Sequence, residues 1–350
     1  MRFETTIGWD LGGAHIKAAY LDDRGRIKNV VQLPCPLWQG LLHLEYAIDG
    51  VLAELTRPAR VHAVTMTGEL VDLFDDRRQG VSTLVDLMGR RFAHSELKFF
   101  GGEAGFVAGC EASRMYGQVA SSNWFASALL AAQRLPYGLL VDIGSTTSDF
   151  IPFHAGALAT MSRDDHGRLL RQELVYTGVV RTPLMTVAKR VPFAGEWVPL
   201  MAEHFASTAD IYRLTSDLPE DADQFPAADQ GEKDAMGSAR RLARMVGLDL
   251  DAADLRVWRS LARFVAEQQM RQLADACECV LSRGLLPDQA PLIGAGVGAF
   301  LVERLAARLE RPFLRFDGLL VDIDDTDSGR IGDCAPAVAV ALLAQGRSSL

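Results

Sequence analysis

The feature that most constrains the fold of this chain is a short turn motif that occurs twice. In each copy an apolar strand ends in Asp-x-Gly, the chain turns on small residues, and a second strand follows. Aligning Asp10 with Asp142 also aligns Gly12 with Gly144, an offset of 132 residues. The two copies span Ile7–Lys17 and Leu140–Asp149. This repetition predicts two related β-hairpins, one in each half of the chain.

Turns of this composition can bind phosphate, because glycine adopts positive φ and brings backbone N–H groups close to oxygen. The predicted phosphate-binding residues are Gly12, Gly13, Ala14 and His15 in the first turn, and Gly144, Ser145, Thr146 and Thr147 in the second. A carboxylate at the strand end can hold Mg²⁺, usually through water. Asp10 and Asp142 are therefore predicted Mg²⁺ ligands. Two such turns facing each other would bind one polyphosphate and its metal, although either turn alone also fits an ordinary hairpin.

A third glycine-rich turn follows an apolar strand near the end of the chain. Its glycines are Gly294, Gly296 and Gly298, and a helical pattern begins directly after them. Such a turn can admit a nucleotide or a substrate tail against the backbone, and a helix N-terminus favours anions. Close helix–strand packing is the alternative explanation. Because the chain also contains the two hairpins, phosphate binding is favoured over simple packing for this third turn.

Polar side chains next to the turns are candidates for the chemistry itself. Lys17 follows Asp10 by seven residues and is expected to point back toward the turn and neutralise phosphate charge. A solvated lysine on the strand is the alternative. Asp149 follows the second turn and is expected to ligate or position the metal. Asp10, Asp142, Asp149 and Lys17 form the predicted catalytic set, in which Asp10 and Asp142 each qualify as metal ligand or base.

Other residues are expected to line the walls of the site. Thr177 and Arg181 belong to a polar, turn-forming run, where Arg181 is either an anion-binding residue or part of a structural salt bridge. Asn123 and the turn Thr67–Glu69 are candidates for the opposite wall. Three arginines that share a helical face, Arg240, Arg241 and Arg244, are further candidates for a substrate tail or a solvated surface.

The spacing of apolar residues predicts an α/β protein of two domains, a natural division for 350 residues. We expect an N-terminal domain at 1–136 and a C-terminal domain at 137–350, with an insertion at about 162–255. Alternating and apolar runs predict strands at 5–10, 14–22, 27–33, 61–65 and 97–100. Helical spacing predicts helices at 41–55, 80–92, 121–135, 255–283 and 334–343.

Composition narrows the class of partner to small molecules. The net charge of −9 argues against nucleic acid and against anionic membranes. No apolar run is long enough to span a bilayer, and the first residues lead into a strand without a signal-peptide pattern. The five cysteines are scattered and odd in number, which predicts reduced thiols and a cytoplasmic location. A homo-oligomer is left open.

Two Asp-x-Gly hairpins followed by a late Gly-x-Gly-x-Gly turn resemble the actin–Hsp70–sugar-kinase superfamily. The resemblance implies two RNase-H-like domains with a cleft between them and an inserted subdomain in the second. Within that superfamily, three phrases are similar to the hydantoinase/oxoprolinase-related branch: Gly8–Lys17, Asp142–Asp149 and Tyr176–Pro183. Ser207–Leu214 and Ala239–Gly247 strengthen this similarity.

Within the branch, the chain most resembles a small single-chain family linked to tetrahydromethanopterin-dependent one-carbon metabolism. That resemblance implies a synthase of methanofuran or methylofuran biosynthesis. It would join an aminomethyl-furanylmethyl diphosphate to the phenol of γ-glutamyltyramine, forming an aryl ether and releasing diphosphate. Mg²⁺ is the expected cofactor, and ATP is compatible with the site but not required.

An ATP-dependent small-molecule kinase or a hydantoinase-like ATPase is the alternative, because the same turns can bind a nucleotide. A non-enzymatic nucleotide switch is a third class. His15 stands where kinase-type turns carry Thr or Ser, which disfavours ordinary γ-phosphoryl transfer. The shortness of the chain likewise disfavours a ring-opening amidohydrolase.

Overall fold

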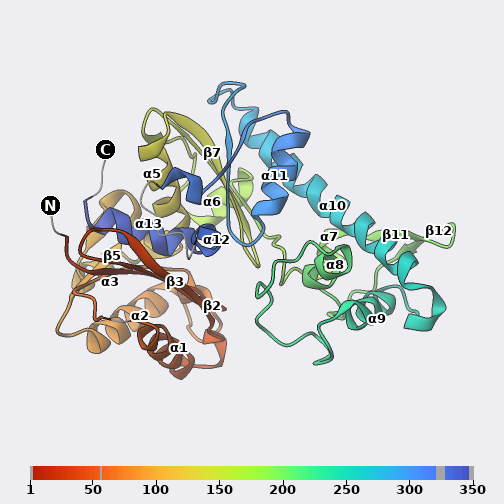
Figure 1. Ribbon diagram of the computed structural model, residues 1–350, viewed down its shortest axis with the longest axis horizontal. Coiled ribbons are helices and arrows are strands. Elements are labelled where there is room, and N and C mark those ends of the chain that lie inside the picture. The colour runs from red at the N-terminus through yellow and green to blue at the C-terminus, as the bar shows by residue number, and fades with distance from the viewer. Residues whose placement is uncertain (1–2, 56, 321–327, 347–350) are drawn as a thin grey trace. The chain divides into compact units, whose positions relative to one another are not determined.

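The computed structural model describes residues 3–55, 57–320 and 328–346, and the chain divides into two compact units (Figure 1). The first unit contains Met1–Gly138, Ile151–Arg168 and Arg315–Leu350, and the second contains Leu139–Phe150 and Leu169–Leu314. The sequence predicted contiguous domains at 1–136 and 137–350. The C-terminal segment instead joins the first unit, because its apolar helix packs on the first sheet.

The first unit is built on a six-stranded sheet of order β3-β2-β1-β4-β5-β6. The central strands are buried along their whole length, as expected for strands covered on both faces. β1 pairs antiparallel with β2 and parallel with β4, so the predicted hairpin and the following crossover are confirmed. The strands are β1 (Thr6–Leu11), β2 (His15–Leu21), β3 (Ile27–Pro34), β4 (Val61–Met66), β5 (Glu96–Phe100) and β6 (Phe106–Val107).

Helices cover this sheet, and their apolar residues supply the core. The C-terminal helix α13 packs so closely on β1 that a Cβ at Gly8 would lie 2.0 Å from the carbonyl oxygen of Ala337. The helices are α1 (Leu41–Ala53), α2 (Arg77–Arg91), α3 (Gly109–Arg114), α4 (Tyr116–Val119), α5 (Asn123–Arg134), α12 (Ser328–Ile331) and α13 (Ala335–Ala344). Short 3₁₀ turns are η1 (Leu37–Gln39), η2 (Gly68–Leu70), η3 (Gly102–Ala104), η5 (Asp317–Leu319) and η6 (Gly332–Cys334).

A second sheet has the order β10-β8-β7-β13-β14, with β9 paired to β8. Here β7 lies between its hairpin partner β8 and the parallel strand β13, which repeats the arrangement of β1 between β2 and β4. The strands are β7 (Tyr137–Ile143), β8 (Ser148–His154), β9 (Ala157–Leu158), β10 (Leu174–Val175), β13 (Leu292–Ala295) and β14 (Phe313–Arg315). The predicted second hairpin is therefore present.

The rest of the second unit is mainly helical and has a core of its own between Leu184 and Val265. This core overlaps the predicted insertion at about 162–255. Its surface includes a hairpin of β11 (Arg190–Phe193) and β12 (Glu196–Pro199). The helices between β9 and β14 are α6 (Asp165–Leu170), α7 (Leu184–Val187), α8 (Thr208–Thr215), α9 (Ala235–Met245), η4 (Leu250–Ala252), α10 (Leu255–Leu281) and α11 (Ala299–Arg308).

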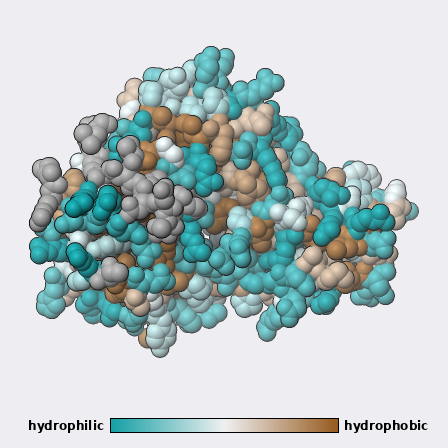
Figure 2. All heavy atoms as spheres, viewed as in Figure 1, coloured by the Kyte–Doolittle hydropathy of each residue, from teal (hydrophilic) through white to brown (hydrophobic). Residues whose placement is uncertain are grey.

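Hydrophilic side chains cover most of the face drawn in Figure 2, with hydrophobic residues exposed between them. Among the large apolar side chains that remain exposed are Trp197 at 54 % and Leu170 at 68 %. In the described part of the chain, no helix combines the length and the apolar character needed to cross a bilayer.

Candidate functional site

The two predicted turns have the same backbone closure. In the first unit the Gly12 N–H donates to the carbonyl of His15 at 3.0 Å. In the second unit the Gly144 N–H donates to the carbonyl of Thr147 at 2.9 Å. The bonded pairs are again offset by 132 residues, so the repeated sequence forms a repeated local structure. The glycine N–H closes each turn, which differs from the expectation that it would point at phosphate.

The donors available to an anion are instead the two central N–H groups of each turn. Within the described residues, the backbone N–H groups of Gly13 and Ala14 donate no hydrogen bond to the protein. The same holds for the N–H groups of Ser145 and Thr146. Successive N–H groups that point the same way from a turn form a small anion-binding concavity. The structure thus places this pair of donors at both predicted phosphate sites.

In the first unit, the turn lies at the carboxyl ends of the parallel strands β1 and β4. The Thr67 N–H donates to the carbonyl of Leu11 at 3.0 Å. A Cβ at Gly68 would lie 3.0 Å from that same Leu11 oxygen, so η2 packs directly against the turn. Asp10 is 5 % exposed and His15 is 7 % exposed, so both side chains are buried beside this turn. Gly12 and Thr67 are therefore neighbours, whereas the sequence made the turn Thr67–Glu69 a candidate for the opposite wall of the site.

Lys17 is held at the C-terminal segment of the first unit. Its Nζ donates to the backbone carbonyl of Asp333 at 2.7 Å. Burial raises the pKa of the Asp333 carboxyl, and the Lys17 charge partly offsets that rise. The sequence predicted a lysine that points back to the turn, whereas the structure shows an ammonium anchored to η6.

In the second unit, the polar run after β10 wraps around the second turn. The Val179 N–H donates to the Gly144 carbonyl at 3.1 Å, and the Arg181 N–H donates to the Ser145 carbonyl at 2.8 Å. A Cβ at Gly178 would lie 2.5 Å from the Thr146 nitrogen, so only glycine fits there. These contacts hold the run against the second turn, and the predicted role of Thr177 and Arg181 in substrate binding stays a prediction.

Thr177 serves to hold this run in place. Its Oγ1 accepts a 2.7 Å hydrogen bond from the amide of Gln269 on α10, and its carbonyl accepts from the Ser148 hydroxyl at 2.6 Å. Thr177 is 2 % exposed. The guanidinium of Arg181 lies 5.8 Å from the centre of the Phe225 ring and is exposed. Of the two, Arg181 is the residue placed to meet a ligand.

The third glycine turn packs against the strand end that carries Asp142. Gly296 has φ of +76°, and a Cβ there would lie 2.4 Å from both Asp142 Oδ1 and the Ile143 carbonyl oxygen. The Gly298 N–H donates to the Ile143 carbonyl at 2.8 Å. Gly294 is buried beneath Phe313. The second and third turns therefore form one backbone cluster around Asp142, and the predicted phosphate binding by the third turn stays a prediction.

Asp149 and Asn123 are the remaining predicted site residues. Asp149 is partly exposed on β8, where it pairs with Leu174 of β10. Asn123 begins α5, and its Oδ1 accepts from the Trp124 N–H at 2.8 Å. Asn123 follows Ser122, whose hydroxyl lies 3.4 Å from that of Thr65 on β4.

The three arginines of α9 divide between structural roles and the surface. Arg241 is fully buried and donates to Asp210 at 2.7 Å and to Asp229 at 2.9 Å. Arg244 also donates to Asp229. The expectation that this group binds a substrate tail is corrected for Arg241, because its guanidinium is used inside the second unit. Arg240 is exposed and lines a separate pocket of about 710 Å³.

Sequence reasoning placed Glu69 only in a turn and missed its surroundings. Glu69 is 1 % exposed, and its Oε1 accepts hydrogen bonds from the backbone N–H and the hydroxyl of Ser121. The Ser121 hydroxyl also lies 3.1 Å from Oδ2 of Asp165, which Arg77 contacts at 2.6 Å. Burial raises the pKa of Glu69 to about 7, against smaller opposing effects of its own N–H, Ser121 and Arg77. A glutamate after a buried strand was the only available signal.

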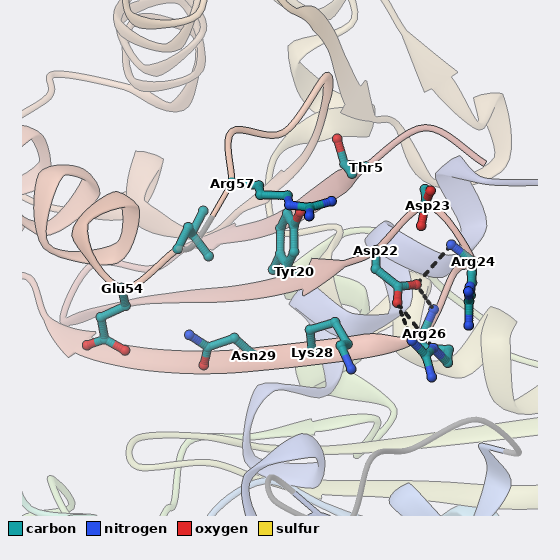
Figure 3. A pocket seen from close by; sticks show the side chains of 11 residues that line it. Thr5, Tyr20, Asp22, Asp23, Arg24, Arg26, Lys28, Asn29, Glu54 and Arg57 are labelled. Atoms are coloured by element: carbon teal, nitrogen blue, oxygen red, sulfur yellow. Dashed lines mark hydrogen bonds and ion pairs between the residues drawn. The ribbon is translucent and has the colours of Figure 1, made fainter. Parts of the chain in front are cut away.

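A pocket of about 530 Å³ lies at the other end of the first hairpin (Figure 3). Thr5 precedes β1 and Asp22 follows β2, so the pocket is at the opposite strand ends from the Gly12 turn. Figure 3 shows Asp22 directed at Arg24 and Arg26, and Arg26 donates to its Oδ2 at 3.0 Å. The charges in this pocket thus partly compensate each other, and it is separate from the predicted phosphate site.

No cluster of three or more His, Cys, Asp or Glu side chains suited to a metal occurs among the described residues. Each turn instead offers one carboxylate at its strand end, Asp10 or Asp142. Mg²⁺ in phosphate sites commonly uses one or two protein carboxylates, with substrate oxygens and water completing its shell. This donor set therefore fits Mg²⁺ brought with a phosphorylated substrate better than a fully protein-bound ion.

Comparison with known proteins supports one family. The hydantoinase/oxoprolinase model matches residues 60–312. A protein of Methanocaldococcus jannaschii named (4-{4-[2-(gamma-L-glutamylamino)ethyl]phenoxymethyl}furan-2-yl)methanamine synthase is 30 % identical over 245 residues, which is 69 % of this chain and 72 % of that protein. A protein of the same name from Methanococcus vannielii is 33 % identical over 113 residues, covering 32 % of this chain and 50 % of that protein.

The fold is shared with a solved structure of much lower sequence similarity. A nucleotide-free acetone carboxylase aligns with a TM-score of 0.54 at 9 % identity, over 97 % of this chain and 70 % of that one. The α/β fold with two related sheets, predicted from the actin and sugar-kinase resemblance, is confirmed.

Proposed function

The chain belongs to the hydantoinase/oxoprolinase family and is an enzyme, and from this premise we propose that it condenses an aminomethyl-furanylmethyl diphosphate with the phenol of γ-glutamyltyramine. The products are an aryl ether and diphosphate. The reaction belongs to methanofuran or methylofuran biosynthesis, in line with the names of the two matched relatives. This makes the protein a transferase of an aryl-alkyl group.

The observation that carries the proposal is the pair of identical turns with free central N–H groups. Gly13 and Ala14 offer two donors in the first unit, and Ser145 and Thr146 offer two in the second. Two adjacent N–H donors can bind the oxygens of a phosphate group, and backbone donors aimed at developing negative charge are a large source of catalysis. The proposed leaving group therefore matches the donors that the fold repeats.

The reacting carbon is attached to a furan ring, which stabilises positive charge as the bond to diphosphate weakens. The N–H groups of the turns stabilise the negative charge that grows on the leaving diphosphate. Arg181 lies beside the second turn and is placed to pair with an anionic group of either substrate. The phenol, with an ordinary pKa of about 10, must lose its proton as it attacks. The reaction therefore yields the ether, diphosphate and one proton, which passes to a base.

Mg²⁺ bound with the diphosphate would neutralise part of its charge and improve the leaving group. Asp10 and Asp142 are the residues we propose to hold it, each contributing one carboxylate. Asp142 is the better placed of the two for this role, because it is partly exposed whereas Asp10 is buried.

The test is to give the purified protein the furan diphosphate, γ-glutamyltyramine and Mg²⁺, with and without ATP. Diphosphate release and an ether of the expected mass are measured together. Ether formed without ATP supports the proposal. ADP formation without ether would contradict it and favour a kinase or ATPase.

A further inference from the structure

Glu69 is a buried carboxyl group with one oxygen engaged and one oxygen without a partner among the other described residues. Oε1 accepts from the Ser121 N–H at 2.9 Å and lies 3.1 Å from the Ser121 hydroxyl. Oε2 makes no hydrogen bond and is closed off from solvent. An ionised carboxylate in this position would leave a charged oxygen unsolvated, which is costly unless a ligand or a proton satisfies it.

This carboxyl group lies at the first phosphate turn. Glu69 belongs to η2, and a Cβ on the preceding Gly68 would meet the Leu11 oxygen at 3.0 Å and the Gly12 carbonyl carbon at 3.4 Å. On its other side, α2 packs so closely that a Cβ at Gly80 would lie 2.6 Å from the Glu69 carbonyl oxygen. Glu69 is thus fixed between a helix and the strand ends that carry the turn.

Ser121 connects Glu69 to a second carboxylate. Its hydroxyl lies 3.1 Å from Oε1 of Glu69 and 3.1 Å from Oδ2 of Asp165. One hydroxyl has one hydrogen and can donate to only one of these oxygens. The other contact is satisfied only if a carboxyl group supplies a proton. The geometry therefore fits a chain in which Glu69 donates to the Ser121 hydroxyl and that hydroxyl donates to Asp165.

The chain of contacts ends at a group that reaches solvent. The Asp165 side chain is 15 % exposed, in contrast to Glu69 at 1 %. Arg77 holds Asp165 at 2.6 Å, and Arg168 lies 4.0 Å from its other oxygen. Asp165 therefore lies between two guanidinium groups at the end of this series of contacts.

We propose that Glu69 takes the proton of the attacking phenol on Oε2 once substrate binding has opened a path to this atom, which is closed off in the protein without substrates, and that Ser121 and Asp165 carry a proton from it to solvent. This inference rests on the proposed function. The O–H bond of the phenol breaks as its oxygen forms the C–O bond to the furanylmethyl carbon and diphosphate leaves. The carboxyl group of Glu69 then turns its O–H toward the Ser121 hydroxyl, which passes its own hydrogen to Asp165 and thence to water. Glu69 returns to the carboxylate.

The electrostatics of the pocket suit a proton acceptor that works near neutral pH. Burial raises the pKa of Glu69 to about 7, and an acceptor is most effective when its pKa is near the working pH. Arg77 on α2 is the charged group that acts on Glu69 directly, and Asp165 on α6 faces it across the Ser121 hydroxyl. Arg77 opposes the rise, so burial is the dominant cause.

The first variant is Glu69→Gln, which keeps the shape and removes the acceptor. We expect kcat to fall about 10²- to 10⁴-fold, the range for loss of a general base, with KM for both substrates nearly unchanged. The wild-type rate should rise with pH through about 7, and that rise should be absent in the variant. A variant rate within about twofold of wild type at every pH would overturn the proposal.

The second variant, Ser121→Gly, removes the hydroxyl from the proton path without straining the backbone. Ser121 has φ of +50°, which glycine adopts readily, and the N–H that donates to Glu69 is kept. We expect kcat to fall and its solvent deuterium isotope effect to grow, because the proton must leave by a slower route. Asp164→Asn is the matched control, since the exposed Asp164 carboxylate accepts hydrogen bonds from the Ser162 hydroxyl and the Gly167 N–H. Equal effects of the control and Ser121→Gly on kcat and on the isotope effect would contradict the proposed proton path.

An infrared titration of the protein without substrates separates this inference from the proposed function. A protonated carboxyl band that disappears near pH 7 in wild type and is missing in Glu69→Gln supports the proton path, even if no ether forms with the furan substrates. Absence of such a band in wild type overturns it, even if ether forms.

Discussion

The Nζ atom of Lys17 and the backbone carbonyl oxygen of Asp333 lie 2.7 Å apart, in a hydrogen bond between residues 316 positions distant in sequence. The bond fastens the second strand of the first hairpin to η6, just before α13. It explains how a lysine next to a predicted phosphate turn contributes to the fold of the first unit.

Replacing Lys17 tests this structural role. Lys17→Met should lower the free energy of unfolding by about 1–3 kcal/mol, the usual cost of losing a charged hydrogen bond. Urea unfolding measures the change. Lys28→Met is the control, because Lys28 is exposed on β3. If Lys17 also neutralises phosphate, KM for the diphosphate substrate rises as well. An unfolding curve equal to that of the control would show that the bond contributes nothing.

Gly296→Ala should disturb the second phosphate site through the backbone. The added Cβ meets Asp142 Oδ1 and the Ile143 oxygen at 2.4 Å, in addition to the strain of φ +76°. Gly284→Ala is a matched control, since Gly284 has φ of +67° and no atom within 4 Å of its Cβ position. The control should cost about 1–3 kcal/mol from backbone strain alone. Gly296→Ala should cost more and also reduce turnover, whereas equal losses would contradict the clash.

Asp142→Asn should reduce turnover by about 10³-fold if this carboxylate holds the metal of the diphosphate, the scale expected when transition-state charge stabilisation is lost. The measurement is kcat over a range of Mg²⁺ concentrations, with circular dichroism to verify folding. Asp149→Asn serves for comparison, because Asp149 lies on β8 beyond the turn. Near-normal turnover of Asp142→Asn would remove this residue from the site.

Stability should depend on pH through Glu69. Its pKa is about 7 in the folded protein, above the ordinary value of 4.5, so folding favours the protonated form. The contribution is complete below about pH 4.5 and is lost as pH rises through 7. The stability of wild type relative to Glu69→Gln should therefore fall by about 3 kcal/mol between pH 4.5 and 8. Urea unfolding of both proteins at several pH values measures this, and a constant difference would contradict a raised pKa.

Arg241→Met should destabilise the second unit without touching the proposed chemistry. Removing the guanidinium leaves Asp210 and Asp229 without their buried partner, which typically costs about 3–5 kcal/mol. Arg240→Met on the same helix is exposed and should change stability by less than about 0.5 kcal/mol. The melting temperatures of both variants, measured by thermal unfolding, are compared with that of the wild type. Similar melting temperatures would mean that the buried network is not stabilising.

Local sequence was sufficient for the hairpins, the turns and several of the longer helices. Strand periodicity and small residues act over a few neighbours, so β1, β2, β7 and β8 were predictable, and the turns at Gly12 and Gly144 close alike because their local sequences are alike. The helical pattern behind α10 (255–283) agrees with the observed Leu255–Leu281. The predicted catalytic role of Asp10, Asp142, Asp149 and Lys17 stays a prediction.

Tertiary structure alone decided which distant residues meet. The sequence by itself determined the repeated turns and the apolar pattern, because turn geometry and amphipathic spacing depend on adjacent residues. It did not determine that α13 joins the first unit, that Lys17 binds Asp333, or that Ser121 links Glu69 to Asp165. Those contacts join segments 44 to 316 residues apart, and their free energy exists only when packing has removed water around them.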